Sequence, residues 1–194
     1  MFKRLILSCA LFAFCSASFA QEVAWKEYDL KGKNPIGLNA KVKYPADFEQ
    51  SISNDKDTVS IDFLKYFDNK DAAYVGLLGT KAEIGDDIDK VTEEDMQLFA
   101  KVFAESGGFK VSGMKYFKYK GLPALIFDAE LSGNVSGDKR YSKDTRVIVL
   151  TKEHAINLSC GITGLEKAKK VTVDTHKRLK DTFCTKYFNT LELN

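Results

Sequence analysis

The sequence predicts an α+β fold in which a mainly antiparallel sheet is flanked by helices. Three observations lead to this prediction. Segments that alternate apolar and polar residues are joined by short turns, and two segments, 92–107 and 173–191, place apolar residues at helical spacing. The elements also follow the order strands, helix, further strands and closing helix, which is typical of a sheet that covers the apolar sides of its helices.

The N-terminal part predicts two strands, residues 23–30 and 36–44, separated by the turn 31–35. The second strand has the clearer pattern, because apolar residues occupy alternate positions: Ile36, Leu38, Ala40, Val42 and Tyr44. Pro45 ends this strand.

A polar stretch, residues 51–57, leads to a third strand with an apolar face formed by Val59, Ile61 and Phe63. The turn residues 68–71 precede a fourth strand, 72–80. We therefore expect the third and fourth strands to form a hairpin.

The first helix has clear start and stop signals. Thr92 can cap the first turn, three acidic residues follow it, and Gly107-Gly108 closes the helix. Its apolar stripe, which we expect to pack on the sheet, consists of Met96, Phe99, Ala100, Val102 and Phe103.

Four strands in meander order are predicted next, with a polar loop at 132–144 and a turn at 152–154: the strands are 109–119, 122–131, 145–150 and 155–162. The closing helix, about 173–191, is expected to be capped by Thr172 or Asp174. One face of it holds Val173, His176, Phe183, Cys184, Tyr187 and Leu191. Lys180 shares that face and does not fit, so either it reaches the edge of the interface or the helical phase is different.

Residues 1–20 have the pattern of a cleavable signal peptide. Lys3 and Arg4 precede an apolar run, and Ser18 and Ala20 stand where signal peptidase requires small side chains, so the mature chain is expected to begin at Gln21. The apolar run is too short for a membrane-spanning helix. Neither Cys9 nor Cys15 has the setting of a lipidated cysteine. We expect an exported protein, periplasmic or secreted, with residues 21–194 as a single domain.

Cleavage changes the charge and the cysteine count. Without Lys3 and Arg4, 27 of the 29 basic residues remain, which equals the 27 acidic residues, so nucleic-acid binding is not expected. Cys160 and Cys184 are the two remaining cysteines, and an oxidising compartment favours a disulfide between them. The alternatives are two buried thiols or a redox pair, although no Cys-x-x-Cys motif is present.

Three short segments resemble the PsbP-like fold: Lys43 to Phe48, Gly121 to Ala124, and the hairpin from Arg146 to Leu158. This resemblance implies an α/β/α sandwich over most of the mature chain. The fold is shared by an extrinsic photosystem II protein, a Ran-binding import factor and bacterial envelope proteins. It implies no catalytic residue, because its members share architecture more than activity.

Motifs for chemistry are absent from the sequence. The two histidines, His154 and His176, have no partner at a metal-ligand spacing, and no nucleophile elbow, phosphate loop or dinucleotide fingerprint occurs. Acidic residues that could bind calcium lie in two predicted loops, but the EF-hand pattern is missing. These residues are Asp55, Asp57, Asp86, Asp87 and Asp89. Such clusters are more often solvent-exposed loops than metal sites. No metal or cofactor is therefore expected.

The segment 115–120 interleaves aromatic and cationic residues, which is the composition of a stacking platform for sugars or bases. Its candidate binding residues are Lys115, Tyr116, Phe117 and Tyr119. An ordinary exposed strand explains the pattern equally well.

The sequence favours a non-enzymatic exported protein that binds a protein partner or supports an envelope assembly. One alternative is a small-ligand or lipid-binding domain, with a pocket between helix and sheet lined by Phe99, Phe103 and Phe117. A third is a hydrolase whose site is assembled from residues distant in sequence.

Overall fold

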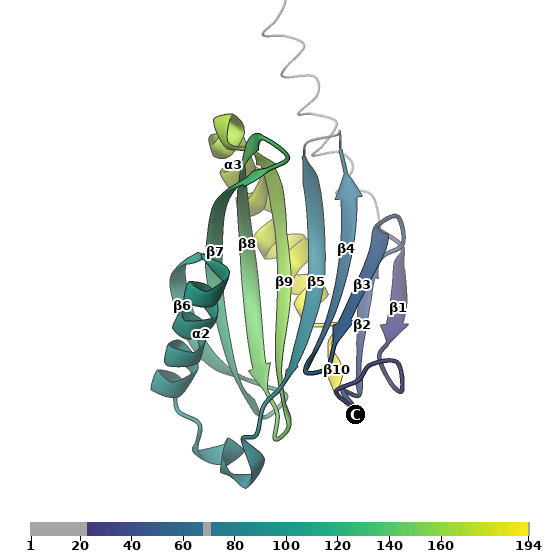
Figure 1. The fold of residues 1–194 in the computed structure, drawn as a ribbon, viewed down its shortest axis with the longest axis vertical. Coiled ribbons are helices and arrows are strands. Elements are labelled where there is room, and N and C mark those ends of the chain that lie inside the picture. The colour runs from purple at the N-terminus through teal and green to yellow at the C-terminus, as the bar shows by residue number, and fades with distance from the viewer. Residues whose placement is uncertain (1–22, 68–70, 194) are drawn as a thin grey trace, which may run out of the picture.

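The computed structural model describes residues 23–67 and 71–193. The expected signal peptide and most of the turn 68–71 lie outside the described residues. The fold is α+β, with one seven-stranded antiparallel sheet and one three-stranded sheet (Figure 1). None of the helices in the described ranges is long and apolar enough to cross a membrane.

The smaller sheet has the order β1-β2-β10 and the larger one the order β3-β4-β5-β9-β8-β7-β6. The strands are β1 (Trp25–Asp29), β2 (Ala40–Pro45), β3 (Glu49–Asp55), β4 (Thr58–Tyr66), β5 (Ala72–Lys81), β6 (Lys110–Tyr119), β7 (Leu122–Val135), β8 (Asp138–Leu150), β9 (His154–Leu165) and β10 (Glu192–Leu193). The α-helices are α2 (Glu93–Gly107), α3 (Lys169–Leu179) and α4 (Thr185–Phe188).

Much of this order was predicted. β4 and β5 form the expected hairpin, with Ile61 opposite Leu77, and β6 to β9 form the expected meander. The prediction of a loop at 132–144 was wrong, because β7 and β8 extend to Val135 and from Asp138 as a long polar hairpin. Alternation is a weak signal there, since both faces are polar.

Two strands were not predicted. β3 lies in the stretch taken as polar, and all seven of its residues are exposed, as an edge strand permits. β10 adds two residues to β2, with Glu192 opposite Lys41. Neither strand has the half-buried apolar pattern from which strands are recognised.

Helix α2 begins and ends as the sequence predicted. The Thr92 hydroxyl accepts a hydrogen bond from the backbone N–H of Asp95 at 3.2 Å, and the Asp95 carboxylate accepts one from the Thr92 N–H at 2.9 Å. Gly108 adopts the left-handed conformation that ends the helix, with φ of 70°. Met96, Ala100 and Ala104 form the buried side of the helix. The expected stripe was therefore wrong for Phe99 and Val102, which are exposed because the helix turns its small residues to the sheet.

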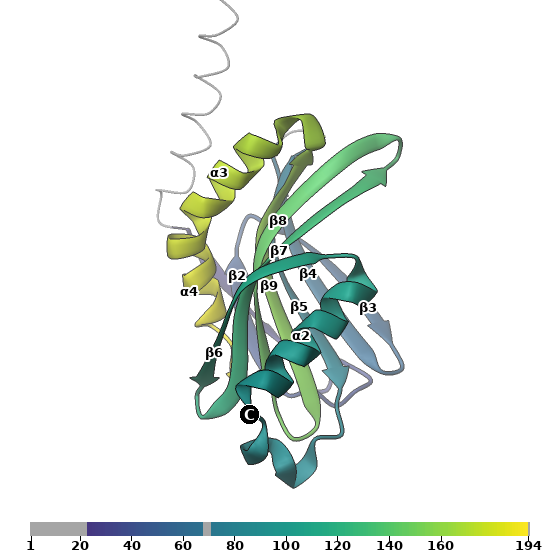
Figure 2. The same ribbon diagram turned by 90° about the vertical axis from the view of Figure 1, so that its left-hand side faces the viewer.

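The large sheet buries apolar residues on both faces. Consecutive strand residues point to opposite faces, and Ala124 packs with the C-terminal helices whereas Leu125 packs with α2. We call the face that bears Leu125 the α2 face and the opposite one the α3 face. Figure 2 shows the two helical regions from the side, with α3 and α4 apart from α2.

The closing helix differs from the prediction at its start. A 3₁₀ turn at Glu166–Ala168 leads into α3, and no side chain caps its N-terminus, so neither Thr172 nor Asp174 has the expected role. Thr172 is instead buried. Between α3 and α4 the chain forms a π-helical segment, Lys180–Cys184, which changes the helical phase within the closing helix.

The disulfide between Cys160 of β9 and Cys184 is confirmed, with a Cα separation of 5.5 Å. Both residues are buried, at 1% and 0% exposure. The bridge therefore joins the centre of the large sheet to the closing helix.

Candidate functional site

The α2 face of the large sheet is covered over only part of its width. Helix α2 makes its main contacts with β6 and β7, and Figure 1 shows β9, β5, β4 and β3 farther along the sheet, where α2 does not cover them. We call the α2 face of β4, β5 and β9 the open half. Its side chains remain partly exposed: Ser60, Asp62, Tyr74, Leu78 and Ser159. Partly exposed polar side chains beside an ordered helix make this surface the candidate site.

A row of residues crosses the open half in register. Arg146 of β8 lies opposite Ser159 of β9. Gly76 of β5 continues the row, because it pairs with Ser159 of β9 on one side and with Asp62 of β4 on the other. A Cβ atom on Gly76 would lie 2.6 Å from Oδ1 of Asp62 and 2.9 Å from Oγ of Ser159. The absence of a side chain at Gly76 thus leaves the space into which both of these side chains lean.

A buried ion pair borders this row. Nε of Arg146 donates to Oδ1 of Asp144 at 3.1 Å, and Nη2 donates to Oδ2 at 2.9 Å. The Tyr74 hydroxyl donates to Oδ2 of the same carboxylate at 2.7 Å. Burial, aided by the charge of Asp144, raises the pKa of Tyr74 well above its ordinary value, so the hydroxyl remains a donor. Asp144 therefore neutralises the guanidinium of Arg146.

Two aromatic rings lie over Arg146. The centroid of the Phe109 ring is 4.0 Å from the guanidinium carbon, and that of Phe103 on α2 is 5.6 Å away. These cation–π contacts hold the arginine at the boundary between α2 and the open half.

The open half contains a small hollow of about 180 Å³, formed mainly by residues of β4, β5 and β9. Its polar lining residues include Asp62 and Asn157. The Oδ1 atom of Asn157 is buried and accepts no hydrogen bond from a described residue. Burial raises the pKa of Asp62, and its one hydrogen bond within the described chain comes from the Ser60 hydroxyl at 3.3 Å. The hollow thus presents two acceptors with unused capacity.

The side of α2 next to the open half is apolar. Phe103 contacts Arg146, and Phe99 lies one turn before it on the same flank. Leu98, Phe99 and Val102 are 62%, 36% and 58% exposed. We call Leu98, Phe99 and Val102 the α2 flank. By helical period Leu98 and Val102 point away from the sheet, opposite the buried Ala100, and Phe99 lies between Val102 and Phe103. Exposed large side chains on the outer side of a helix are a common property of protein-binding surfaces.

The α3 face holds a separate polar network around Asp128. Nζ of Lys180 donates to both Asp128 oxygens, at 2.7 and 2.8 Å, which explains why Lys180 points inward. The Thr145 hydroxyl donates to Asp128 at 2.8 Å and lies 3.1 Å from Nε2 of His176. Although a hydroxyl next to a histidine is the arrangement of a nucleophile and its base, Thr145 is fully buried, at 0% exposure. The buried hydroxyl of Thr145 thus links Asp128 of β7 with His176 of α3.

The residues of the basic-aromatic segment are divided between two faces. Lys115, Phe117 and Tyr119 point to the α3 face, while Tyr116 packs with the α2 cluster. The Tyr119 hydroxyl is buried and lies within hydrogen-bond distance of the backbone carbonyl oxygens of Phe188 and Leu191, which share its one proton. The four side chains therefore share no stacking surface.

This placement also corrects the expected apolar pocket. Phe117 lies on the α3 face, so it cannot line a pocket with Phe99 and Phe103 of α2. Beneath α2 the side chains of Met96 and Ala100 are fully buried against the sheet.

The acidic residues of the loops do not converge. Asp86 pairs with Lys152 and Asp87 with Lys90, both at 2.6 Å. Throughout residues 23–67 and 71–193, no group of three His, Cys, Asp or Glu side chains could hold a metal ion.

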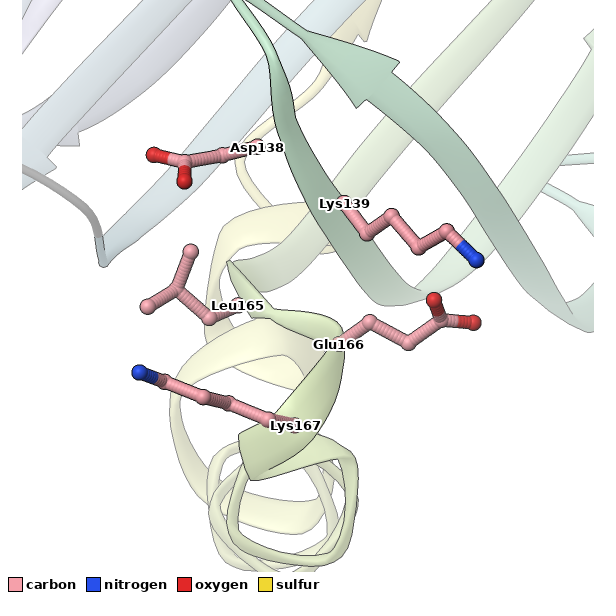
Figure 3. Close-up of a pocket in the computed structure, with 5 residues that line it drawn as sticks. All are labelled: Asp138, Lys139, Leu165, Glu166 and Lys167. Atoms are coloured by element: carbon pink, nitrogen blue, oxygen red, sulfur yellow. The ribbon is translucent and has the colours of Figure 1, made fainter.

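A second hollow lies at the far end of the β7–β8 hairpin, beside the start of α3 (Figure 3). Its volume is about 410 Å³, and its lining is Asp138, Lys139, Leu165, Glu166 and Lys167. In Figure 3 the side chains of Asp138, Leu165 and Lys167 extend to one side and those of Lys139 and Glu166 to the other, so the five do not point to one place. This lining of mixed charge offers no convergent set of ligands.

Sequence reasoning missed the residues of the open half. Asp144 was assigned to a loop, and Arg146 was read only as part of a hairpin. A signal was present in the glycines within strands, Gly76 and Gly161, since a glycine inside a strand often marks a close approach. A Cβ on Gly161 would collide with the side chain of Asp144.

The chain matches no protein-family model and no curated protein. Among solved structures it resembles LpqN, a protein involved in cell envelope biogenesis of Mycobacterium tuberculosis, with 15% identity, a TM-score of 0.39, and coverage of 81% of this chain and 89% of LpqN. The resemblance is one of fold.

A structure from Bacteroides thetaiotaomicron shares 13% identity with a TM-score of 0.44, over 87% of this chain and 48% of the other. PA94 of Pseudomonas aeruginosa, a protein of unknown function, shares 14% identity with a TM-score of 0.38, over 82% and 95% of the two chains. No residue role passes from these proteins to this chain.

Proposed function

We propose that this chain is a non-enzymatic, exported binding protein of the PsbP-like α/β/α type, and that it binds a protein partner through the open half and the α2 flank. The observation that carries the proposal is the exposed apolar row of α2 beside a polar sheet surface. Protein interfaces combine such apolar anchors with polar surroundings.

The geometry favours a protein over a lipid or another small apolar ligand. The apolar side chains of the α2 flank face outward, whereas the buried side of α2 is packed on the sheet with Met96 and Ala100 fully buried. An outward apolar row suits a flat partner surface, and a small apolar ligand needs an enclosed pocket. The buried disulfide fits an oxidising compartment, which supports export.

Affinity capture with purified variants tests the proposal. The wild-type protein and Lys177→Glu, a change on exposed α3 surface, should retain the same protein from the envelope fraction of the source cell. Phe99→Glu should lose it, because the new charge lies within the apolar contact. Equal retention by Phe99→Glu and the wild type would contradict the proposed surface.

A further inference from the structure

The hollow in the open half has a charge imbalance that indicates what it receives, if the proposed binding surface is correct. Arg146 and Asp144 neutralise each other through the hydrogen bonds described above. Arg146 and Asp62 are the charged residues that line the hollow, and the charge of Arg146 partly offsets the effect of burial on the pKa of Asp62. Arg146 makes its ion pair with Asp144, however, and no cation lies at ion-pair distance from Asp62 in the described chain. A partly buried carboxylate without a cation is unusual, since desolvation disfavours its charged form.

The second acceptor is independent of this charge. Asn157 is only 8% exposed, lines the same hollow, and has a buried Oδ1 atom without a hydrogen-bond donor. A buried acceptor left without a donor costs free energy, so Asn157 lacks a hydrogen-bond donor while Asp62 lacks a cation, and one group could supply both. That group is a hydrogen-bond donor with positive charge.

We propose that the hollow receives the cationic end of a lysine or arginine side chain from the protein partner. The volume of about 180 Å³ suits a single polar head group rather than a whole small molecule. Phe103 of α2 contacts Arg146, a lining residue of the hollow, and Phe99 lies one turn from Phe103, so the aliphatic stem of such a side chain could pack on these rings. The carboxylate of Asp62 would form the ion pair and Asn157 Oδ1 would accept a further hydrogen bond.

Nuclear magnetic resonance titration with small probes tests this inference apart from the proposed function. The ¹⁵N-labelled protein is titrated with the N-acetyl methylamides of lysine, arginine, norleucine and glutamate. We expect lysine or arginine to shift the Asn157 side-chain amide and the Gly76 backbone amide in a saturable way, with Kd on the order of millimolar for so small a probe. Added salt should weaken this binding.

Three variants assign the effect to the hollow. Asp62→Asn and Asn157→Leu keep the size of the side chain and should each weaken binding, the first by about tenfold or more because it removes a charge-assisted hydrogen bond. Asp86→Asn, a change of equal charge on an exposed loop, should leave binding unchanged.

Equal shifts with norleucine, preferential binding of glutamate, or no saturable shift with any probe would overturn the cation site. If Phe99→Glu still abolishes partner capture in that case, the proposed function stands and only the cation site fails. If lysine binds as expected while capture does not depend on Phe99, the cation site stands and the proposed surface fails.

Discussion

Removing the disulfide should lower the free energy of unfolding by about 3.5 kcal/mol. Cys160 and Cys184 are 24 positions apart, and the chain-entropy relation gives that value for a loop of this size at 25 °C. With an m-value of about 2 kcal/mol/M, the urea midpoint of Cys184→Ala should fall by roughly 1.7 M. Urea unfolding followed by circular dichroism measures this shift.

A reductant provides the matched control for this variant. Both sulfurs belong to buried residues, so the reductant must act during unfolding, and it should lower the midpoint of the wild type but leave Cys184→Ala unchanged. A loss below about 1 kcal/mol, or an equal response of both proteins to reductant, would show that the bridge does not link the sheet to the closing helix as described.

Three further predictions concern the ionisable groups and the helix cap. Burial raises the pKa of Asp62 above 3.8, so the free energy of unfolding falls as the pH rises from 3.8 through the raised pKa. Asp62→Asn should therefore raise the melting temperature at pH 7, and a melting temperature below that of the wild type would contradict this. Burial lowers the pKa of His176 below 6.5, so the free energy of unfolding should decrease as the pH falls below about 6.5. Urea unfolding at several pH values measures this dependence, and His176→Gln should remove it. Thr92→Ala should cost about 1 kcal/mol in thermal unfolding through loss of the α2 cap, and a neutral effect would exclude this role.

The sequence predicted those parts of the fold in which one face of an element is apolar. The hairpin of β4 and β5, the cap at Thr92 and the pairing of Cys160 with Cys184 all follow from local pattern or compartment. β3 was missed because an exposed edge strand shows no apolar alternation, and the β7–β8 extension was missed for the same reason.

The candidate site was not predictable because it depends on register across strands. Asp62 and Gly76 belong to the predicted hairpin of β4 and β5, but Arg146 of β8 is far from both in the chain, and Gly76 was the one local signal. Only the pairing of β4, β5, β9 and β8 brings them into one row. The inward position of Lys180 on the closing helix could not be predicted for the same reason, since its partner Asp128 lies 52 positions away on β7.

Site-specific photo-crosslinking tests the binding surface most directly. A photoreactive residue placed at Phe99, or at Leu78 in the open half, should link to one and the same partner protein, whereas the same residue at Lys177 on α3 should not. Cross-links from Lys177 but from neither Phe99 nor Leu78 would contradict the claim that the open half and the α2 flank bind the partner.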